Sequence, residues 1–240
     1  MAAALGSKAR IGQLYPSGGL CDHEIQRMAP DGVHFITTRM PFRKAALEDD
    51  AALARDVESH AMLLADARVD LIAFNCTAAS LVTGPDAINR RIEAATGIRS
   101  VTTIEAVLQA LDATGIRRFA LLTPYLPEVV AAETAFFAER GLQVSASAGL
   151  PCADPVEQGC IEPQRWLEFA RVLREAPGDG LLISCAGIQI SGVLAEIEHI
   201  FGRPVIASNQ ALLWTCLRRL DLAERPHGYG ALLEGVFDRP

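Results

Sequence analysis

Two cysteines stand at the ends of two short apolar runs. Cys76 closes the run "DLIAFNC" (residues 70–76), and Cys185 closes the run "GLLISC" (residues 180–185). A cysteine that follows a strand and precedes a helix lies near unpaired N–H groups, which lower the thiol pKa from its ordinary value of about 8.5. The resulting thiolate can remove a proton from carbon or attack it. One such cysteine is more simply a small buried residue, but two at matching positions favour paired proton chemistry.

The residues beside these cysteines are small or polar. Asn75, Thr77 and Ala78 flank the first cysteine, and Ala186 and Gly187 follow the second. Side-chain and backbone donors of these kinds can hydrogen-bond a carboxylate. The alternative for Thr77 is ordinary capping of a helix. We interpret the five residues as candidate substrate-binding residues.

Two further segments follow predicted strands. Pro16, Ser17 and Gly18 follow the first apolar run, where small residues let backbone N–H groups approach an anion. The same letters are equally typical of a tight turn. Tyr125, in "LTPYLP", follows another strand and is expected to face the same cleft, with a half-buried aromatic as the alternative.

The elements that must position these residues alternate along the chain between β-rich runs and helical patterns. The expected strands are 10–15, 33–38, 69–76, 100–103, 119–123, 143–150, 180–185 and 204–208. Several are continuously apolar, which is typical of strands buried on both faces of a parallel sheet. Pro85, Pro127 and Pro163 stand where first helical turns should begin. This alternation predicts a doubly wound α/β fold.

The second half of the chain echoes the first. After each cysteine run come a turn, a helix and a linker, "TGIRSVTT" from Thr96 in one case and "FGRPVIAS" from Phe201 in the other. Each linker leads into a strand and a leucine-bearing helix. We therefore expect two pseudo-symmetric parallel-sheet halves, residues 1–115 and 116–240, with the active site between them. The last helix is free to cross back onto the first half.

Composition excludes several classes of protein. The net charge of −7 disfavours nucleic acid as a partner. No apolar run approaches the roughly 18 residues that span a membrane, so we expect a soluble, cytoplasmic protein without a membrane partner. The six cysteines include no C-x-x-C pair, and Cys152 with Cys160 would make only an incomplete zinc site. We therefore expect no metal and no disulfide framework, and association into a homo-oligomer stays open.

Together these features resemble the aspartate/glutamate racemase superfamily, and within it the branch of maleate cis-trans isomerases and arylmalonate decarboxylases. The likeness runs from "RIGQLYPSGGL" to "HGYGALLEG", and its more specific segments are "NCTAAS", "LTPY", "EQGCIEP" and "ISCAGI". The resemblance implies two α/β halves, no cofactor, and a small carboxylate or dicarboxylate substrate. It also implies that Cys76 and Cys185 are catalytic. The carboxylate cradle would comprise Pro16–Gly18, Thr77, Ala78, Tyr125 and the backbone after the second cysteine.

The sequence also departs from each branch of that family. Cys76 stands where arylmalonate decarboxylases have no cysteine, whereas Pro155 stands where a maleate isomerase is expected to carry asparagine. The leading hypothesis is a two-cysteine isomerase or racemase, acting by proton transfer or by thiol addition. The alternatives are an arylmalonate-type decarboxylase with Cys185 as proton donor, and a carboxylate-binding protein without catalysis.

Overall fold

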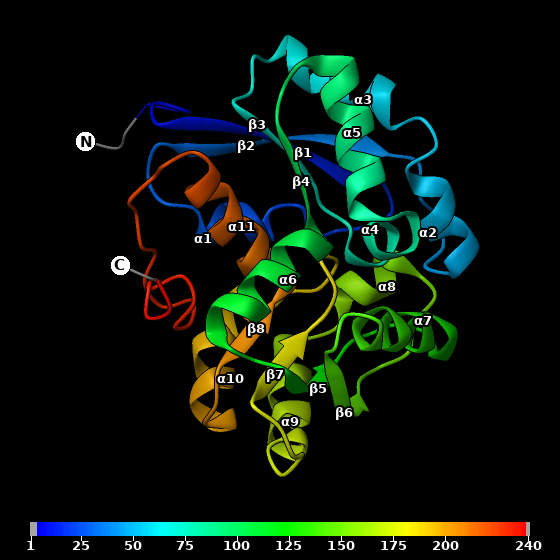
Figure 1. Ribbon diagram of the computed structural model, residues 1–240, viewed down its shortest axis with the longest axis vertical. Coiled ribbons are helices and arrows are strands. Elements are labelled where there is room, and N and C mark those ends of the chain that lie inside the picture. Colours follow the sequence, from blue (N-terminus) through cyan, green and yellow to red (C-terminus); the bar gives the residue numbers. More distant parts are fainter. Residues whose placement is uncertain (1–3, 239–240) are drawn as a thin grey trace.

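The computed structural model describes residues 4–238 and contains two four-stranded sheets whose strands are all parallel (Figure 1). The first sheet has the order β2-β1-β3-β4, and the second has the order β6-β5-β7-β8. The first comprises β1 (Ala9–Pro16), β2 (Val33–Met40), β3 (Leu71–Phe74) and β4 (Ser100–Thr102), and the second comprises β5 (Arg118–Leu122), β6 (Gln143–Ala148), β7 (Gly180–Ile183) and β8 (Val205–Ala207). The two sheets therefore repeat one strand order, and the predicted fold class is confirmed.

The central strands form because their sequences are apolar on both faces. Every residue of β3 and of β7 is buried, as expected for strands covered by helices on both sides. All eight predicted strands are present, but β3 and β7 end earlier than predicted. Cys76 and Cys185 each lie two residues beyond the end of a strand, after Phe74 and Ile183 respectively.

Eleven α-helices and one 3₁₀ helix connect the strands within residues 4–238. They are α1 (Glu24–Met28), α2 (Leu47–Leu53), α3 (Val57–Asp66), α4 (Thr77–Thr83), α5 (Pro85–Thr96), α6 (Thr103–Thr114), α7 (Pro127–Ala138), α8 (Pro155–Cys160), α9 (Pro163–Leu173), η1 (Ser191–Val193), α10 (Leu194–Phe201) and α11 (Ser208–Arg219). As predicted, Pro85, Pro127 and Pro163 begin helices, and Pro155 does too.

The two sheets are joined by α6 and α11, which occupy matching places after β4 and β8 and pack against each other (Figure 1). Their apolar side chains, among them Val107, Leu111, Leu213 and Leu217, belong to one core cluster. The division expected after residue 115 falls in the turn between α6 and β5. Helix α11 nevertheless contacts α1 of the first half.

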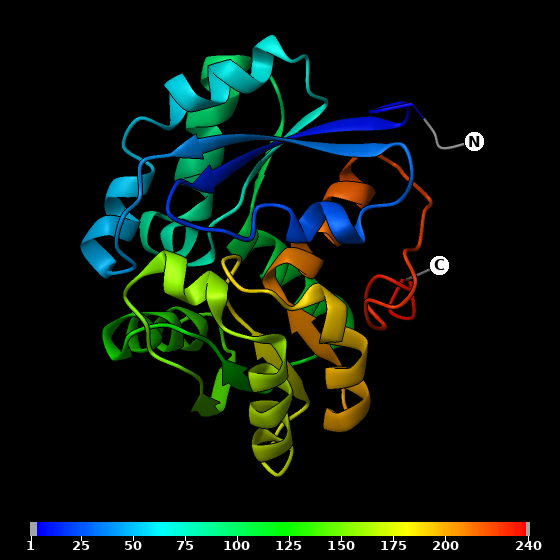
Figure 2. The same cartoon turned by 180° about the vertical axis from the view of Figure 1, so that it is seen from behind.

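The segment after α11 also returns to the first half, where it runs beside α1 and α11 (Figure 2). There the Tyr229 hydroxyl donates a 2.7 Å hydrogen bond to the carbonyl oxygen of Arg27. Lys8 forms an ion pair with Glu224 in the same region. Throughout the described residues, no helix combines the length and the apolar composition that crossing a membrane requires.

Candidate active site

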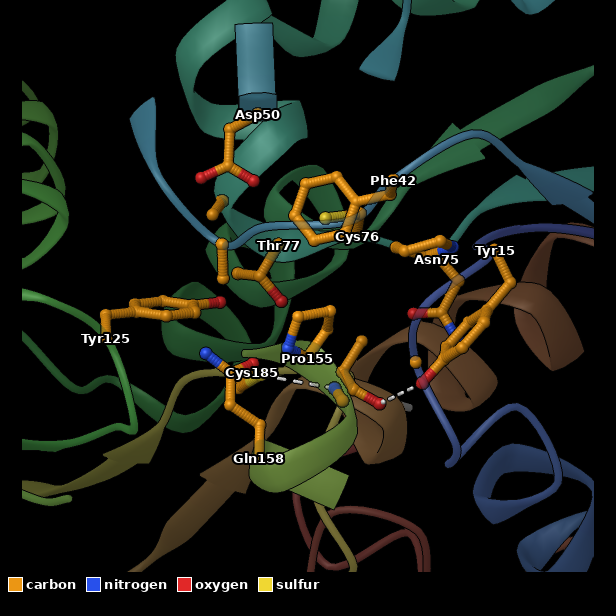
Figure 3. Close-up of a pocket in the computed structure, with 16 residues that line it drawn as sticks. Tyr15, Phe42, Asp50, Asn75, Cys76, Thr77, Tyr125, Pro155, Gln158 and Cys185 are labelled. Carbon is orange, nitrogen blue, oxygen red and sulfur yellow. Dashed lines mark hydrogen bonds between the residues drawn. The ribbon is translucent and has the colours of Figure 1, made fainter. Parts of the chain in front are cut away.

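Both cysteines line one small cavity between the two sheets (Figure 3). Its volume of about 40 Å³ is enough for a few water-sized groups. Most of the lining residues come from strand ends or from the segments that follow strands, in both halves, as expected for a parallel-sheet site. The lining residues are Tyr15, Pro16, Gly19, Phe42, Ala45, Asp50, Asn75, Cys76, Thr77, Ala78, Tyr125, Pro155, Gln158, Cys185, Ala186 and Gly187.

Cys76 lies at the junction of β3 and α4. Its backbone is extended (φ −150°, ψ 113°), and the next residue begins the helix. The N–H groups of Ala78 and Ala79 donate hydrogen bonds to the sulfur, which favours a thiolate. The side chain is nevertheless buried, and burial raises the pKa of the Cys76 thiol well above its ordinary value, with nearby Asp50 adding to the effect.

Cys185 occupies the matching place after β7. Burial raises the pKa of its thiol to about 12, although the Gly187 N–H donates to Sγ at 3.2 Å and the Tyr125 hydroxyl also hydrogen-bonds the sulfur. The expectation of lowered thiol pKa values is therefore wrong for both cysteines. Loss of solvation outweighs the local donors because the two residues are only 8% and 7% exposed.

Hydrogen bonds tie the cysteine segments together across the two halves. Ser208 Oγ accepts from the Cys185 N–H at 3.2 Å and from Thr77 Oγ1 at 2.9 Å. The predicted substrate-binding hydroxyl of Thr77 is thus directed to a protein partner.

The amide of Asn75 is also used internally. Its Nδ2 donates to Gln13 Oε1 at 3.1 Å and to Asn209 Oδ1 at 2.9 Å, and its Oδ1 accepts from Thr103 Oγ1 at 3.1 Å. Asn209 in turn donates to the carbonyl oxygen of Ala186 at 3.0 Å. Asn75 therefore borders the cavity, but its amide group bonds to protein partners and stabilises the cavity walls.

Two unpaired N–H groups of the cavity wall directly follow the cysteines. Thr77 and Ala186 each directly follow one of the two cysteines, and both residues are buried in the cavity wall. Their N–H groups have no hydrogen-bond partner in the described part of the chain. A buried unpaired N–H group is uncommon in proteins. These two donors are therefore the strongest candidates to bind a carboxylate.

The turn at Pro16–Gly18 is placed differently from the sequence-based interpretation. Pro16 lines the cavity, but Ser17 and Gly18 do not. The Ser17 N–H donates to the carbonyl oxygen of Met40 at 2.8 Å, and the Gly18 N–H donates to that of Phe42 at 3.0 Å. These donors fasten the turn to the end of β2 and to the segment that follows it, so they are not available to an anion.

Sequence reasoning missed several cavity residues. Tyr15 donates a 3.4 Å hydrogen bond to the carbonyl oxygen of Ala186, and its hydroxyl accepts from the N–H of Cys21. Gln158 donates to the carbonyl oxygen of Cys152 at 2.6 Å. Gln158 lies within "EQGCIEP", a segment of the family resemblance, which was the available signal.

The remaining missed residues belong largely to an apolar wall formed by Phe42, Ala45 and Pro155. The two segments that carry this wall, the loop after β2 and the loop leading into α8, are tied by the Ala45 N–H, which donates to the carbonyl oxygen of Ala153 at 2.8 Å. No lysine, arginine or histidine of the described chain is among the lining residues. Likewise, no group of three or more His, Cys, Asp or Glu residues within 4–238 is placed to hold a metal ion.

The repeated sheet order and the shared cavity define a two-halved α/β protein with its candidate site between the halves. The family model of arylmalonate decarboxylase matches residues 12–233. The chain therefore belongs to the arylmalonate decarboxylase and maleate isomerase family of the aspartate/glutamate racemase superfamily, and the resemblance read from its motifs is confirmed.

Individual relatives extend over most of the chain. A maleate isomerase of Nocardia farcinica is 32% identical over 209 residues, 83% of each chain. The arylmalonate decarboxylase of Bordetella bronchiseptica is 29% identical over 236 residues, 95% of this chain and 98% of its own. Among solved structures, a mutant of the N. farcinica maleate cis-trans isomerase with a covalently bound succinylcysteine intermediate superposes with a TM-score of 0.85 at 27% identity, covering 94% of this chain and 98% of that one.

Proposed function

We propose that the protein is a cofactor-independent isomerase or racemase of a small carboxylic acid, with Cys76 and Cys185 as its two reacting groups. The observation that carries this proposal is that thiols from matching positions of the two sheets line one cavity. Membership of a family of isomerases and decarboxylases supports an enzymatic role.

The substrate carboxylate is bound by the N–H groups of Thr77 and Ala186. As a proton leaves the neighbouring carbon, or as a thiol adds to it, negative charge grows on the carboxylate oxygens. Fixed donors that meet this charge typically contribute roughly 10²–10³ each in rate. Because both N–H groups are already unpaired and buried, the site needs no rearrangement to supply them.

The two thiols can act in either of two ways. In a racemisation, one thiolate removes the α-proton and the other thiol returns a proton to the opposite face. In a double-bond isomerisation, the sulfur lone pair of Cys76 forms a C–S bond, the π electrons move to the adjacent carbon, and that carbon takes a proton from Cys185. Rotation about the new carbon–carbon single bond, followed by reversal of these steps, then releases the isomer. The succinylcysteine intermediate of the N. farcinica relative supports the addition route.

Ionisation of a thiol must precede either reaction. Because burial keeps both thiols protonated at neutral pH, only a small fraction is thiolate before the substrate binds. The Tyr125 hydroxyl and the Gly187 N–H stabilise the ionised form of Cys185. The N–H groups of Ala78 and Ala79 do the same for Cys76.

A decarboxylase of a substituted malonate is the second candidate. The apolar wall of Phe42, Ala45 and Pro155 favours it, because departure of carbon dioxide is eased where a carboxylate is poorly solvated. In this reaction the neutral thiol of Cys185 protonates the carbanion left behind, and Cys76 is not required.

The two candidates are separated by turnover assays on maleate, on an enantiopure 2-arylpropionate in deuterated buffer, and on an arylmalonate. An isomerase or racemase loses activity in both Cys76→Ala and Cys185→Ala, and it scrambles or deuterates its substrate. A decarboxylase releases carbon dioxide and loses activity only in Cys185→Ala. The exposed Cys160, outside the cavity, provides the control Cys160→Ala. Full activity of Cys185→Ala on a turned-over substrate would contradict both mechanisms.

A further inference from the structure

One ionisable side chain of the cavity has no part in the reactions described above. Asp50 lies on α2, a helix with three acidic residues in its first turn. Helix α2 packs against α4, which begins directly after Cys76, and Asp50 is only 2% exposed. Figure 3 shows its carboxyl group directed toward the space bordered by Phe42, Thr77 and Tyr125.

The Asp50 carboxyl group has no polar partner within residues 4–238. Its side chain makes no hydrogen bond or ion pair with any described residue, and no cation lines the cavity. Buried carboxyl groups are normally paired, because an unpaired one loses its solvation by water without a compensating hydrogen bond. Burial raises the pKa of Asp50 to about 7, and repulsion from Asp49 adds to the effect. The group is thus a neutral acid at mildly acidic pH and a carboxylate at alkaline pH.

These two forms interact oppositely with an anion in the cavity. A neutral carboxylic acid donates a hydrogen bond, and the bond is strong when its acceptor is a carboxylate. An ionised Asp50 repels the same carboxylate, and no cation in the cavity wall offsets the repulsion. An ionised Asp50 would also raise the pKa of both catalytic thiols further.

We infer that Asp50 is a proton-dependent specificity residue, which in its neutral form donates a hydrogen bond to the second acidic group of a dicarboxylate substrate. This inference rests on the proposed function, in which the first carboxylate is bound by the N–H groups of Thr77 and Ala186. Binding of a dicarboxylate dianion at alkaline pH then takes up one proton from solution.

The other titratable groups near Asp50 are not expected to produce the same proton uptake when a dicarboxylate binds. Asp49 lies on the same helix, and Cys76, Tyr125 and Cys185 face the cavity from β3–α4, β5–α7 and the segment after β7. Burial keeps the last three protonated at neutral pH. Glu133 also has a pKa raised by burial, to about 7, but it does not line the cavity.

The test is calorimetric titration with succinate, which undergoes neither proposed reaction, at pH 6.5 and 8.5 in buffers of different ionisation enthalpy. Wild type should take up close to one proton at pH 8.5 and bind about twentyfold more weakly than at pH 6.5, as linkage to a pKa near 7 requires. Acetate has only the carboxylate that the N–H groups of Thr77 and Ala186 bind, so it accepts no hydrogen bond from Asp50 and should show a smaller proton uptake and a weaker pH dependence than succinate. Asp50→Asn keeps a neutral donor and should bind succinate without proton uptake at both pH values.

Glu133→Gln is the matched control and should retain the uptake. Absent succinate binding at pH 6.5, absent uptake by wild type, or uptake persisting in Asp50→Asn would each overturn the inference. If Asp50→Asn does not fold, the contrast between succinate and acetate on wild type decides alone. Because these titrations involve no turnover, a negative result leaves the cysteine assays of the proposed function to be judged separately.

Discussion

Thr77 and Cys185, which belong to different halves of the chain, share one acceptor, Ser208 Oγ at the start of α11. Ser208 therefore fixes the two cysteine segments relative to each other. It lies 23 residues after Cys185 and 131 residues after Thr77. The relative placement of the two thiols thus depends on a side chain that takes part in neither proposed reaction.

Replacing Ser208 with alanine should therefore loosen the site. The variant leaves a buried N–H and a buried hydroxyl without their acceptor, which costs about 1–3 kcal/mol of unfolding free energy. Urea denaturation measures that loss, and kcat should fall with it. Ser59→Ala, in which the exposed hydroxyl on α3 is removed, is the control. Wild-type stability and kcat in Ser208→Ala would contradict the anchoring role.

Tyr125→Phe tests the hydrogen bond to the sulfur of Cys185. Removing the hydroxyl withdraws a donor that lowers the thiol pKa, so the thiolate becomes harder to form. Because hydrogen bonds to charged groups are worth about 1.5–3 kcal/mol, kcat should fall roughly ten- to hundredfold. Tyr229→Phe removes a hydroxyl far from the cavity and should leave kcat unchanged. An unchanged kcat in Tyr125→Phe would remove this tyrosine from the mechanism.

The buried carboxyl group of Glu133 should make stability depend on pH. It accepts a hydrogen bond from Ser184, and burial raises its pKa from 4.5 to about 7. Because the folded state binds the proton more tightly than the unfolded state, this contribution is complete below pH 4.5 and is lost as pH rises to 7. The loss is on the order of 2–3 kcal/mol.

Urea denaturation between pH 4.5 and 8 measures this slope. Glu133→Gln should make it shallower, leaving the decline that Asp50 contributes in the same direction, which is at least as large because burial raises the pKa of Asp50 from 3.8 to about 7. Asp50→Asn should instead remove the part of the pH-dependent decline in stability that Asp50 contributes. A slope in Glu133→Gln as steep as that of wild type would show that this carboxyl group is already ionised in the folded protein.

Gly18→Ala tests the role of the turn after β1. An added Cβ would lie 2.7 Å from the carbonyl oxygen of Phe42 and 2.7 Å from Cγ of Pro155, so both cavity-wall segments must shift. Overpacking of this kind typically costs about 1–3 kcal/mol. Denaturation and KM should both report the change. Gly192→Ala is the control, because a Cβ there meets no atom within 4 Å. Tolerance of Gly18→Ala would show that the close approach is not required.

Much of the fold could be predicted because its signals are local. The runs that become β3 and β7 are apolar throughout, and prolines mark the first turns of α5, α7 and α9. The pairing of Cys76 with Cys185 could also be predicted, since a repeat places equivalent residues at equivalent sheet edges.

Other parts of the site depend on tertiary packing and carry no local signal. The sequence around Asp50, "LEDDAAL", is typical of a solvated helix start, and only the packing of α2 against α4 buries it. Likewise, the sequence "PSGG" is compatible with a free anion-binding turn. Only the hydrogen bonds to the carbonyl oxygens of Met40 and Phe42 show that its N–H groups are already paired. The predicted direction of the thiol pKa shifts was wrong because the burial that raises these pKa values depends on the whole fold.

The tie between Ala45 and Ala153 has a consequence for access to the cavity. It fastens together the two segments that carry Phe42, Ala45 and Pro155, which form one wall of a small cavity. Any opening of this wall to a carboxylic acid must therefore move both segments together, as must any opening that lets the product leave.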